Sequence, residues 1–442
     1  MLDAECLAAR VRALCPEARG WWVAFSGGVD SRALLHALAS ARDGLDAPLG
    51  AVHVEHGLHP DAAAWAADCR AFCASLDVPF EHLSVDARPG PGESPEAAAR
   101  LARYRALREW LPEGHALLTA HHQDDQAETL LLQLLRGAGP HGLAAMPERA
   151  AFGRGHLIRP LLGLGRADLH RYAEAAGLEW IEDPANRELR YDRNLLRHEI
   201  LPRLERRWPA AAAVLARDAE LQAEAAALLD DLAALDLAPA QGRVGGTLSV
   251  PALRRLPPRR RRNLLRHWLR ERGLRPPSRV VLRHIEHDML EAEADAMPRV
   301  HWPEGEVRRF QDALYAMPPL PPAPDPARVV PWDGGPLELP EAGGRLEVRR
   351  ATGRGLAQRL LAGGLEIHFR QGGERLRPAG SPHHRRLKHL LQEAGLPPWE
   401  RERLPLVYSR DELVAVAGLW VAEGAAAREG EPGLLLHWSR LP

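Results

Sequence analysis

The chain of 442 residues has few cysteines, a single lysine and no long apolar run. Four cysteines are too few for a disulfide framework in a chain of this length. No stretch reaches the roughly 18 apolar residues that a membrane-spanning helix needs. The first residues include Asp3 and Glu5 and do not form the basic, then apolar segment of a secretion signal. We therefore expect a cytoplasmic protein with no membrane partner.

The cysteine spacing also argues against a thiol-based metal or redox site. Cys6, Cys15, Cys69 and Cys73 include no pair separated by two residues, which is the spacing typical of zinc and redox motifs. Cys69 and Cys73 are one helical turn apart, and we interpret them as core or surface thiols. A sulfur-relay role for these two cysteines is the alternative.

Positive charge comes almost entirely from arginine, because Lys388 is the only lysine. A lysine-containing P-loop is excluded, since Leu387 and not glycine precedes that lysine. Residues 254–283 contain twelve arginines and one acidic residue, whereas residues 208–242 contain six carboxylates and one arginine. Guanidinium groups match phosphate oxygens, so the arginine cluster predicts contacts with nucleic acid, and a solvated helix face is the alternative. The predicted contacts are Arg259, Arg260, Arg261 and Arg262.

The length predicts about three domains, and 45% hydrophobic and 26% charged residues are typical of folded, globular chains. Residues 1–205 alternate short β-branched or aromatic runs with longer amphipathic stretches, which predicts an α/β domain with a parallel sheet. The expected strands are residues 21–25, 49–54, 79–85 and 116–120. The expected helices are residues 31–41, 61–76, 94–111 and 123–136.

The remaining chain predicts two further domains and a linker. Residues 206–317 are interpreted as a helical middle domain, rich in alanine and leucine up to about residue 237 and helical again over 258–293. Six prolines in the nine positions 318–326 predict a stiff linker over residues 318–327. Glycine-punctuated runs and a helix near 383–394 predict a small α+β domain over residues 328–442.

The strongest local signal lies between the first expected strand and the helix after it. Two adjacent glycines let the backbone approach an anion, and the helix N-terminus presents free N–H groups. This glycine loop therefore predicts a pocket for a di- or triphosphate, and a glycine turn that only begins a helix is the alternative. Because the loop has no lysine, we expect it to hold a leaving pyrophosphate while ATP reacts at its α-phosphate. The loop residues are Ser26, Gly27, Gly28, Val29, Asp30 and Ser31.

A second polar cluster follows the expected strand 116–120. In an open parallel sheet, ligands bind beyond the carboxyl ends of the strands, so this cluster and the glycine loop should line one crevice. Spacings of three and four residues bring the carboxylates together at the start of a helix, where they could hold magnesium or an ammonium group. Acids that only favour a helix N-terminus are the alternative, and zinc is disfavoured because no further ligand completes a tetrahedron. The cluster contains His121, His122, Asp124, Asp125 and Glu128.

The glycine loop resembles the signature of the PP-loop ATP pyrophosphatase superfamily. Within that superfamily, the chain resembles the bacterial tRNA(Ile)-lysidine synthetases in patches from residue 21 to about residue 422. The patches include the run 99–104, Asp183-Pro184-Ala185-Asn186 and the run 193–197, with further patches at 370–376, 387–393, 397–401 and 414–421. In the second-strand motif, Glu55 stands where the family usually has asparagine and His59 where it usually has arginine. We therefore do not transfer the family's adenine contacts to this segment.

The resemblance implies an N-terminal PP-loop nucleotide-binding domain and an ATP- and Mg²⁺-dependent ligase. The implied reaction joins free L-lysine to carbon 2 of the wobble cytidine of tRNA(Ile) with a CAU anticodon. It passes through an adenylated cytidine and releases AMP and pyrophosphate. Another PP-loop tRNA-modifying enzyme, such as a thiolase, and a non-catalytic tRNA-binding factor are the alternatives. A homodimer is compatible with the sequence.

The resemblance also implies roles for individual residues. The glycine loop with His121, Arg100 and Arg103 is expected to bind ATP. Asp30 and Asp124 are expected near magnesium or the cytidine, and Asp125 and Glu128 at the lysine ammonium, so that these four are the candidate catalytic residues. Arg193 and Arg197 are expected at the ATP phosphates or the lysine carboxylate. The expected C-terminal contacts with tRNA are Arg375, Arg385, Arg386, Lys388 and Trp399, with a packed helix face as the alternative.

Overall fold

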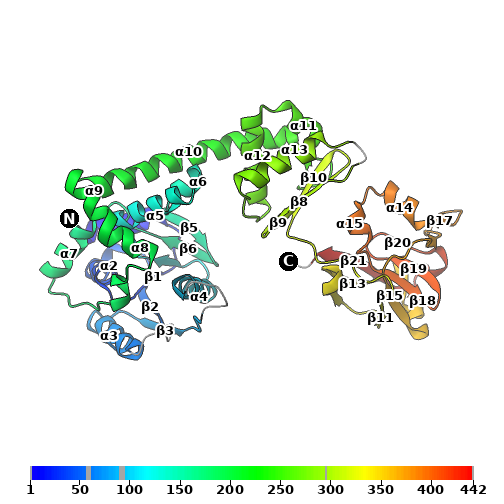
Figure 1. Ribbon diagram of the computed structural model, residues 1–442. Coiled ribbons are helices and arrows are strands. Elements are labelled where there is room, and N and C mark those ends of the chain that lie inside the picture. Colours follow the sequence, from blue (N-terminus) through cyan, green and yellow to red (C-terminus); the bar gives the residue numbers. More distant parts are fainter. Residues whose placement is uncertain (1, 56–60, 89–94, 294–295, 441–442) are drawn as a thin grey trace. The chain divides into compact units, whose positions relative to one another are not determined.

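The structure is a computed structural model that describes residues 2–55, 61–88, 95–293 and 296–440 (Figure 1). It divides into two compact units, Met1–Asp231 and Leu232–Pro442, which are described separately. His59 of the second-strand motif lies outside the described residues. Within the described ranges, no helix has both the length and the apolar character needed to cross a membrane.

The first unit is built on a six-stranded sheet with the strand order β3-β2-β1-β4-β6-β5. All neighbouring strands are parallel except β5, which is antiparallel to β6. The four strands expected from the sequence are confirmed as β1 to β4, whereas the β5–β6 hairpin was not predicted. The strands are β1 (Trp21–Ala24), β2 (Leu49–Glu55), β3 (Phe80–Ser84), β4 (Ala116–Leu118), β5 (Arg149–Phe152) and β6 (Gly155–Ile158).

Helices cover both faces of this sheet (Figure 1). Because alternate strand residues point to opposite faces, Trp21 and Val23 pack with α1 (Ala4–Leu14), α2 (Val29–Ser40), α3 (Ala62–Ser75) and α7 (Arg166–Ala175). Trp22 and Ala24 pack on the other face with α4 (Pro95–Trp110). The expected helices are confirmed as α2, α3, α4 and α5 (Gln123–Leu135). The first unit is therefore an α/β domain with one helical layer on each side.

Cys69 and Cys73 lie on α3 and belong to the core of the first unit. Both are fully buried. Burial raises the pKa of each thiol to about 12, because the thiolate would lose its hydration. They are therefore core thiols that stay protonated at neutral pH.

Two short helices lie between strands of the sheet, η1 (Arg42–Gly44) before β2 and α6 (Pro140–Leu143) before β5. After α7 come the short elements η2 (Pro184–Arg187), α8 (Asp192–Leu195), the π-helix η3 (Leu196–Ile200) and α9 (Leu201–Arg207), and then the long helix α10 (Ala211–Ala240). The helix expected in the alanine- and leucine-rich stretch up to about residue 237 is present as α10. The long helix α10 continues across the division between the two units.

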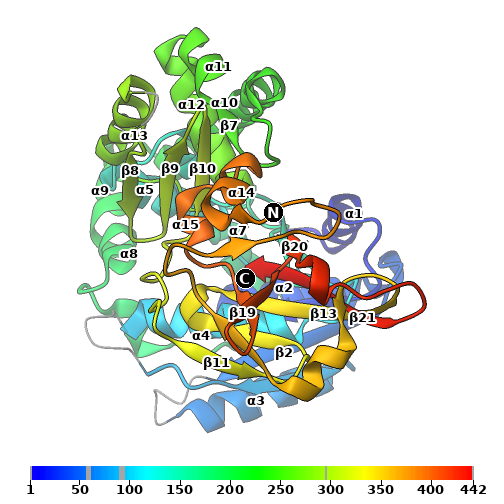
Figure 2. The same ribbon diagram turned by 90° about the vertical axis from the view of Figure 1, so that its right-hand side faces the viewer.

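After the end of α10, three helices of the second unit pack on a small antiparallel sheet (Figure 2). The helices are α11 (Val250–Arg255), α12 (Pro258–Glu271) and α13 (Arg279–Glu291). The sheet has the order β7-β10-β9-β8 and was not predicted. Its strands are β7 (Leu248–Ser249), β8 (Arg299–Trp302), β9 (Gly305–Phe310) and β10 (Ala313–Met317). The sheet could not be recognised from the sequence, because its strands contain charged residues. One of them, Glu306 on β9, is fully buried and pairs with Arg299 and Arg308.

The proline-rich segment has no regular secondary structure, and Arg403 donates hydrogen bonds to the carbonyl oxygens of Pro321 and Pro322. Beyond it, the chain forms sheets with the orders β11-β15-β18-β19-β20 and β12-β13-β21-β14 and the pair β16–β17. The expected α+β architecture is confirmed, although the run 414–421 is split between two antiparallel strands, β19 and β20. The finer domain limits stay a prediction.

The elements of this last region are short. The strands are β11 (Val329–Trp332), β12 (Leu337–Leu339), β13 (Gly344–Thr352), β14 (Leu356–Ala357), β15 (Leu365–His368), β16 (Arg375–Leu376), β17 (Arg385–Arg386), β18 (Leu406–Ser409), β19 (Glu412–Val416), β20 (Trp420–Val421) and β21 (Pro432–Arg440). The helices are η4 (Pro340–Ala342), η5 (Gln358–Gly363), α14 (Leu387–Glu393), α15 (Pro398–Arg401) and η6 (Glu423–Ala425).

Candidate active site

A cavity of about 500 Å³ opens at the carboxyl ends of β1 and β4. In the sheet, β1 has β2 as its neighbour on one side and β4 on the other. The strand order therefore reverses between β1 and β4. Open α/β sheets bind ligands at such a point. The predicted residues in its wall are Ser26, Gly28, Val29, Asp30, Ser31, Arg100, Arg103, His121, Asp125 and Arg197. The glycine loop and the acidic cluster therefore meet in one crevice, as predicted.

The two glycines of the loop have different physical roles. Gly27 has a φ of +82°, and a Cβ there would lie 2.6 Å from Cδ1 of Ile181 and 2.9 Å from Sγ of Cys69. Gly28 is the N-cap residue of α2 with a φ of −73°, and a Cβ there would meet no described atom closer than 3.6 Å. Gly27 is thus required by the protein's own packing, whereas Gly28 keeps the backbone bare on the cavity side.

Hydrogen bonds fix the shape of the loop. Oγ of Ser31 donates to the carbonyl oxygen of Gly28 at 2.9 Å and lies 3.1 Å from Oγ of Ser26. The carbonyl oxygen of Gly27 accepts from Nε of the buried Arg32 at 3.1 Å. Within the described ranges no side chain caps the N-terminus of α2, so the first N–H groups of this helix are available to an anion. The loop is therefore preorganised for phosphate oxygens.

His122 connects the acids of the two motifs. It is 1% exposed, and its ring nitrogens lie 3.6 Å from Asp30, 3.4 Å from Asp124 and 3.5 Å from Asp125. Burial alone lowers the pKa of His122, but contacts with Asp124 and Asp30 and the charge of Asp125 outweigh it and raise the pKa to about 10. The imidazole is therefore a buried cation at neutral pH. This role was not predicted, although His122 belongs to the cluster read from the sequence.

Asp125 and Asp124 are held as carboxylates. Burial raises the pKa of Asp125, but the charges of His122 and Arg193 outweigh it and lower the pKa to about 2. Burial also raises the pKa of Asp124, but contacts with His122 and the N–H of Arg166 leave it below its usual value. The N–H of Arg166 donates to Oδ2 of Asp124 at 2.8 Å, which joins the start of α7 to the acidic cluster.

Glu128 and Asp125 form a compact quartet with Arg193 and Arg197. Nε of Arg193 donates to Oε2 of Glu128 at 2.7 Å, and Nε of Arg197 donates to Oε1 at 2.6 Å. Both arginines also reach Oδ1 of Asp125, at 3.3 and 2.9 Å. Asp125 and Arg197 line the cavity, whereas Glu128, which is fully buried, and Arg193, which is partly buried, lie outside the residues that line it. Both oxygens of Glu128 are engaged by arginine, so its predicted contact with lysine requires a rearrangement and stays a prediction.

The other predicted ATP ligands lie on α4 and after β4. The guanidinium group of Arg100 lies 5.0 Å from the ring centroid of Tyr104, which also lines the cavity. Nδ1 of His121 is 2.8 Å from Oγ1 of Thr119, and burial lowers the pKa of His121 to about 3. His121 is therefore a neutral hydrogen-bonding group, next in sequence to the charged His122.

The segment 180–187 forms another wall of the cavity. Asp183 accepts a hydrogen bond from the N–H of Ala185 at 2.8 Å and so begins η2. Nδ2 of Asn194 donates to the carbonyl oxygen of Ala185 at 2.9 Å, which connects the two runs that resemble the family. Trp180 and His170 also line the cavity and were not predicted. The family-like run at 183–186 was the sequence signal that pointed to this segment.

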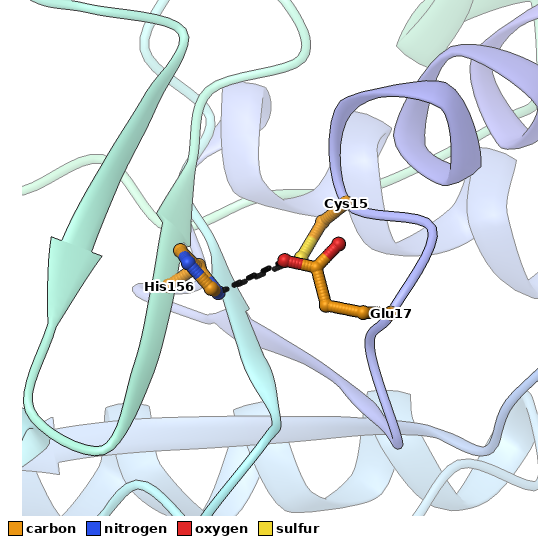
Figure 3. A group of neighbouring side chains, drawn as sticks. All are labelled: Cys15, Glu17 and His156. Carbon is orange, nitrogen blue, oxygen red and sulfur yellow. Dashed lines mark hydrogen bonds and ion pairs between the residues drawn. The ribbon is translucent and has the colours of Figure 1, made fainter.

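Cys15, Glu17 and His156 form a separate group of potential metal ligands within the described residues (Figure 3). Nδ1 of His156 lies 3.7 Å from both Sγ of Cys15 and Oε1 of Glu17. Arg149 donates to Glu17 and to Nε2 of His156, which places the imidazole proton on Nδ1. A metal would have to displace that proton beside a guanidinium group, so we interpret this group as a hydrogen-bonded network.

The residues predicted to contact tRNA occupy different environments. In α12, Arg260 pairs with Asp236, and Arg261 and Arg262 pair with Glu286, while Arg259 is exposed. Near the C-terminus, Arg385 pairs with Glu393. In the β16–β17 pair, Arg375 lies directly opposite Arg386, and both are exposed, as is Lys388. Like charges opposite each other in a sheet are unfavourable unless an anion compensates them.

The expected contact of Trp399 with tRNA is wrong, because the side chain is buried. The ring is 5% exposed and packs edge to face against Phe310 and Tyr315, with centroid distances of 6.2 and 5.4 Å. Arg308 stacks over it at 5.2 Å. The resemblance implied that Trp399 contacts tRNA, with a packed helix face as the alternative. Its large apolar ring is instead buried within the second unit.

The parallel sheet, the lysine-free glycine loop and the neighbouring acids define a PP-loop nucleotide-binding protein, and a family model described as a PP-loop domain matches residues 4–204. Models described as TilS substrate binding domain and TilS substrate C-terminal domain match residues 248–315 and 365–438. A tRNA(Ile)-lysidine synthase of Alkalilimnicola ehrlichii is 47% identical over 97% of this chain and 96% of its own length. One of Methylococcus capsulatus is 45% identical over 94% of this chain and 95% of its own. The chain therefore belongs to the tRNA(Ile)-lysidine synthase family.

One solved structure that is similar to this chain comes from an archaeal enzyme. A U34-tRNA thiolase of Methanococcus maripaludis is 16% identical, with a TM-score of 0.42. The match covers 50% of this chain and 78% of that chain.

Proposed function

We propose that this chain ligates free L-lysine to carbon 2 of the wobble cytidine of tRNA(Ile) with a CAU anticodon, converting ATP to AMP and pyrophosphate. Membership of the family supports ATP-dependent lysidine formation on tRNA(Ile). The single observation that carries the proposal for this site is the meeting of the glycine loop and the acids around His122 in one cavity.

The first step activates the cytidine. The carbonyl oxygen on carbon 2 is a poor leaving group until it carries a phosphate. We propose that this oxygen attacks the α-phosphate of ATP while pyrophosphate leaves. The bare backbone at Gly28 and the free N–H groups of α2 suit the two outer phosphates, on which charge builds up as they depart.

The second step is attack by the ε-amine of lysine on carbon 2, with AMP leaving. The amine has an ordinary pKa of about 10.4, so it must lose a proton before it attacks. Asp125 lines the cavity and has a pKa lowered to about 2. A carboxylate with so low a pKa is a weak base. Its Oδ1 already accepts from Arg193 and Arg197 and its Oδ2 from the N–H of His122. We therefore propose that the charge of Asp125 attracts the lysine ammonium group, that direct contact requires a rearrangement as at Glu128, and that the proton is finally released to water.

We propose Mg²⁺ as the metal that accompanies ATP. Oδ1 of Asp30 is buried and has no hydrogen-bond partner in the described part of the chain, and Asp30 lines the cavity beside the glycine loop. A carboxylate oxygen is the ligand type that Mg²⁺ prefers, so Asp30 fits this ion. Asp124 lies outside the residues that line the cavity and its Oδ2 accepts the N–H of Arg166, so we propose it only as the second acid nearby. Bound there, magnesium would neutralise charge on the phosphates.

The RNA substrate is large, and the exposed Arg375, Arg386 and Lys388 support binding to its phosphates. The alternative of sulfur transfer is disfavoured, because Cys69 and Cys73 are buried and their thiols are protonated at neutral pH. A non-catalytic tRNA-binding role leaves the buried charge cluster around His122 without a function.

The test is incubation of the purified chain with ATP, labelled lysine and tRNA(Ile) bearing a CAU anticodon. We expect label in the RNA that depends on ATP, and no label when the anticodon cytidine is replaced by uridine. RNA that remains unlabelled with an active tRNA preparation would refute the proposal. Modification that requires a sulfur donor would favour the thiolase alternative.

A further inference from the structure

The proposed reaction requires two heterocyclic rings in one cavity, the adenine of ATP and the pyrimidine of the tRNA. Two aromatic side chains that differ in their surroundings line the cavity. Tyr104 comes from α4 and packs edge to face on Phe152, in the core on that side of the sheet. Trp180 comes from the segment after α7. The cavity therefore offers two separate surfaces for flat rings.

Trp180 is tied to both parts of the reaction site. The N–H of the next residue, Ile181, donates to the carbonyl oxygen of Gly27 at 3.0 Å, so Trp180 stands beside the glycine loop. Its ring packs edge to face on His170 of α7, with centroids 5.7 Å apart and planes at 82°. The same helix begins at Arg166, whose N–H binds Asp124. The Trp180 surface is thus joined to the phosphate loop and to the acids.

His170 has an unusual environment for a merely structural residue. Its Nε2 is buried and has no hydrogen-bond partner among the residues that the structure describes. Leaving a polar atom in this state is unfavourable, and such atoms in native proteins commonly have a functional explanation. The contact of His170 with Trp180 is edge-to-face packing of two rings and not a hydrogen bond, so it does not depend on Nε2 having a partner. Its imidazole fixes the plane in which the indole meets the cavity.

We propose that Trp180 stacks on the pyrimidine ring of the wobble cytidine and that His170 is the positioning residue of this indole. The inference rests on the proposed function. Carbon 2 of the base must be reached both by the α-phosphate and by an amine attracted to the acids. Trp180 is next to Ile181, whose N–H donates to Gly27 of the glycine loop. Its ring packs on α7, and the first N–H of that helix donates to Asp124. At Tyr104 the Arg100 guanidinium lies over the ring, 5.0 Å from its centroid, so that face is already covered. Proteins commonly hold an unstacked RNA base on an aromatic side chain.

The test compares steady-state lysine transfer with ATP binding in the full chain. Trp180→Ala should lower kcat/KM for tRNA by about 10- to 100-fold, the range typical of a lost base–aromatic stack. Affinity for ATP, measured by equilibrium dialysis, should stay within about twofold, because phosphate contacts dominate it. Trp180→Phe should recover most of the activity. Trp208→Ala removes an exposed tryptophan from the same unit and serves as the control, with no expected change.

His170 is tested by two substitutions. His170→Phe preserves the edge-to-face contact and should retain near wild-type kcat/KM, whereas His170→Ala should lose several-fold. A His170→Phe variant as defective as His170→Ala would contradict the positioning role. Thermal unfolding of each variant identifies loss of folding.

Three outcomes are distinguishable. No lysine transfer by the wild-type chain would refute the proposed function itself. Wild-type activity together with an unaffected Trp180→Ala variant would refute only the stacking role. An ATP affinity reduced tenfold or more in Trp180→Ala would show that this surface holds the adenine, which would also overturn the inference.

Discussion

Asp30, Asp124 and Asp125 belong to two helices that are far apart in the sequence, yet all three approach the imidazole of His122. A buried cation shared by three carboxylates offsets part of their mutual repulsion. The acids and their crevice could be predicted from the sequence, because their spacing and position after a strand are local properties. The position of His122 between the three acids could not be predicted, because the orientation of His121 and His122 depends on tertiary packing. The pairing of Arg193 and Arg197 with Glu128 also depends on tertiary packing and could not be predicted.

The raised pKa of His122 predicts a pH-dependent stability. The pKa is about 10 in the folded state, against an ordinary value of 6.5 for a histidine in the unfolded chain. The folded state therefore keeps a proton that the unfolded chain loses, so this contribution is complete below pH 6.5 and declines as pH rises toward 10. His122→Gln should lower the thermal unfolding midpoint at pH 6 and flatten its decrease between pH 6.5 and 10. His141→Gln, from an exposed pair with Asp230, should follow the wild-type profile.

The quartet around Glu128 predicts a large cost for removing one charge. Glu128→Gln leaves two largely buried arginines with one carboxylate, Asp125, and should destabilise the chain by about 3 kcal/mol. Asp192→Asn is the matched surface change, because Asp192 and Arg136 are exposed and 3.9 Å apart, and it should cost at most about 1 kcal/mol. Denaturant unfolding monitored by fluorescence measures both. Equal effects would show that the quartet does not hold the site together.

At the scale of elements, the alternation of short apolar strands and amphipathic helices was sufficient to predict β1 to β4 and α2 to α5. The β5–β6 hairpin was missed because its strands are only four residues long and contain the polar residues Arg149 and His156. The β8–β10 sheet was missed because Glu306 is buried and paired with arginines. Both errors arise where charged residues are stabilised by partners distant in the sequence or in another strand.

The glycine loop predicts different results for its two glycines. Gly27→Ala should destabilise the first unit by about 1 to 3 kcal/mol, because its φ is +82° and its Cβ would overlap Ile181 and Cys69. Gly28→Ala should fold normally, since a Cβ there has space, but should weaken ATP binding tenfold or more by obstructing the phosphates. Thermal unfolding and equilibrium dialysis separate the two effects. Normal ATP affinity in Gly28→Ala would exclude this loop from phosphate binding.

At the scale of the whole molecule, an RNA substrate requires contacts outside the cavity. Charge counting in the sequence located two basic regions but could not show which arginines are already engaged by acids. Arg260 is held by the buried Asp236, whereas Arg375 and Arg386 face each other on exposed strands without a compensating acid on that pair. The C-terminal pair is therefore the better candidate for phosphate contacts.

Salt dependence of tRNA binding tests that assignment. Replacing both Arg375 and Arg386 with Ala should weaken binding and reduce the slope of log affinity against log salt by about 1 to 2, since each phosphate contact contributes about 0.7 to 0.9. Arg260→Ala should leave the slope unchanged while lowering thermal stability, because Asp236 would lose its partner. An unchanged slope in the double variant would remove this strand pair from the RNA interface.

The fate of the α-phosphate tests the central claim most directly. The chain is incubated with tRNA(Ile) and ATP labelled at the α-phosphate, first without lysine and then with it. We predict that label enters the RNA as adenylated cytidine and leaves as AMP when lysine is added, whereas ATP labelled at the γ-phosphate never labels the RNA. Label that remains in ATP, or that appears in ADP, would contradict a reaction in which the glycine loop holds departing pyrophosphate.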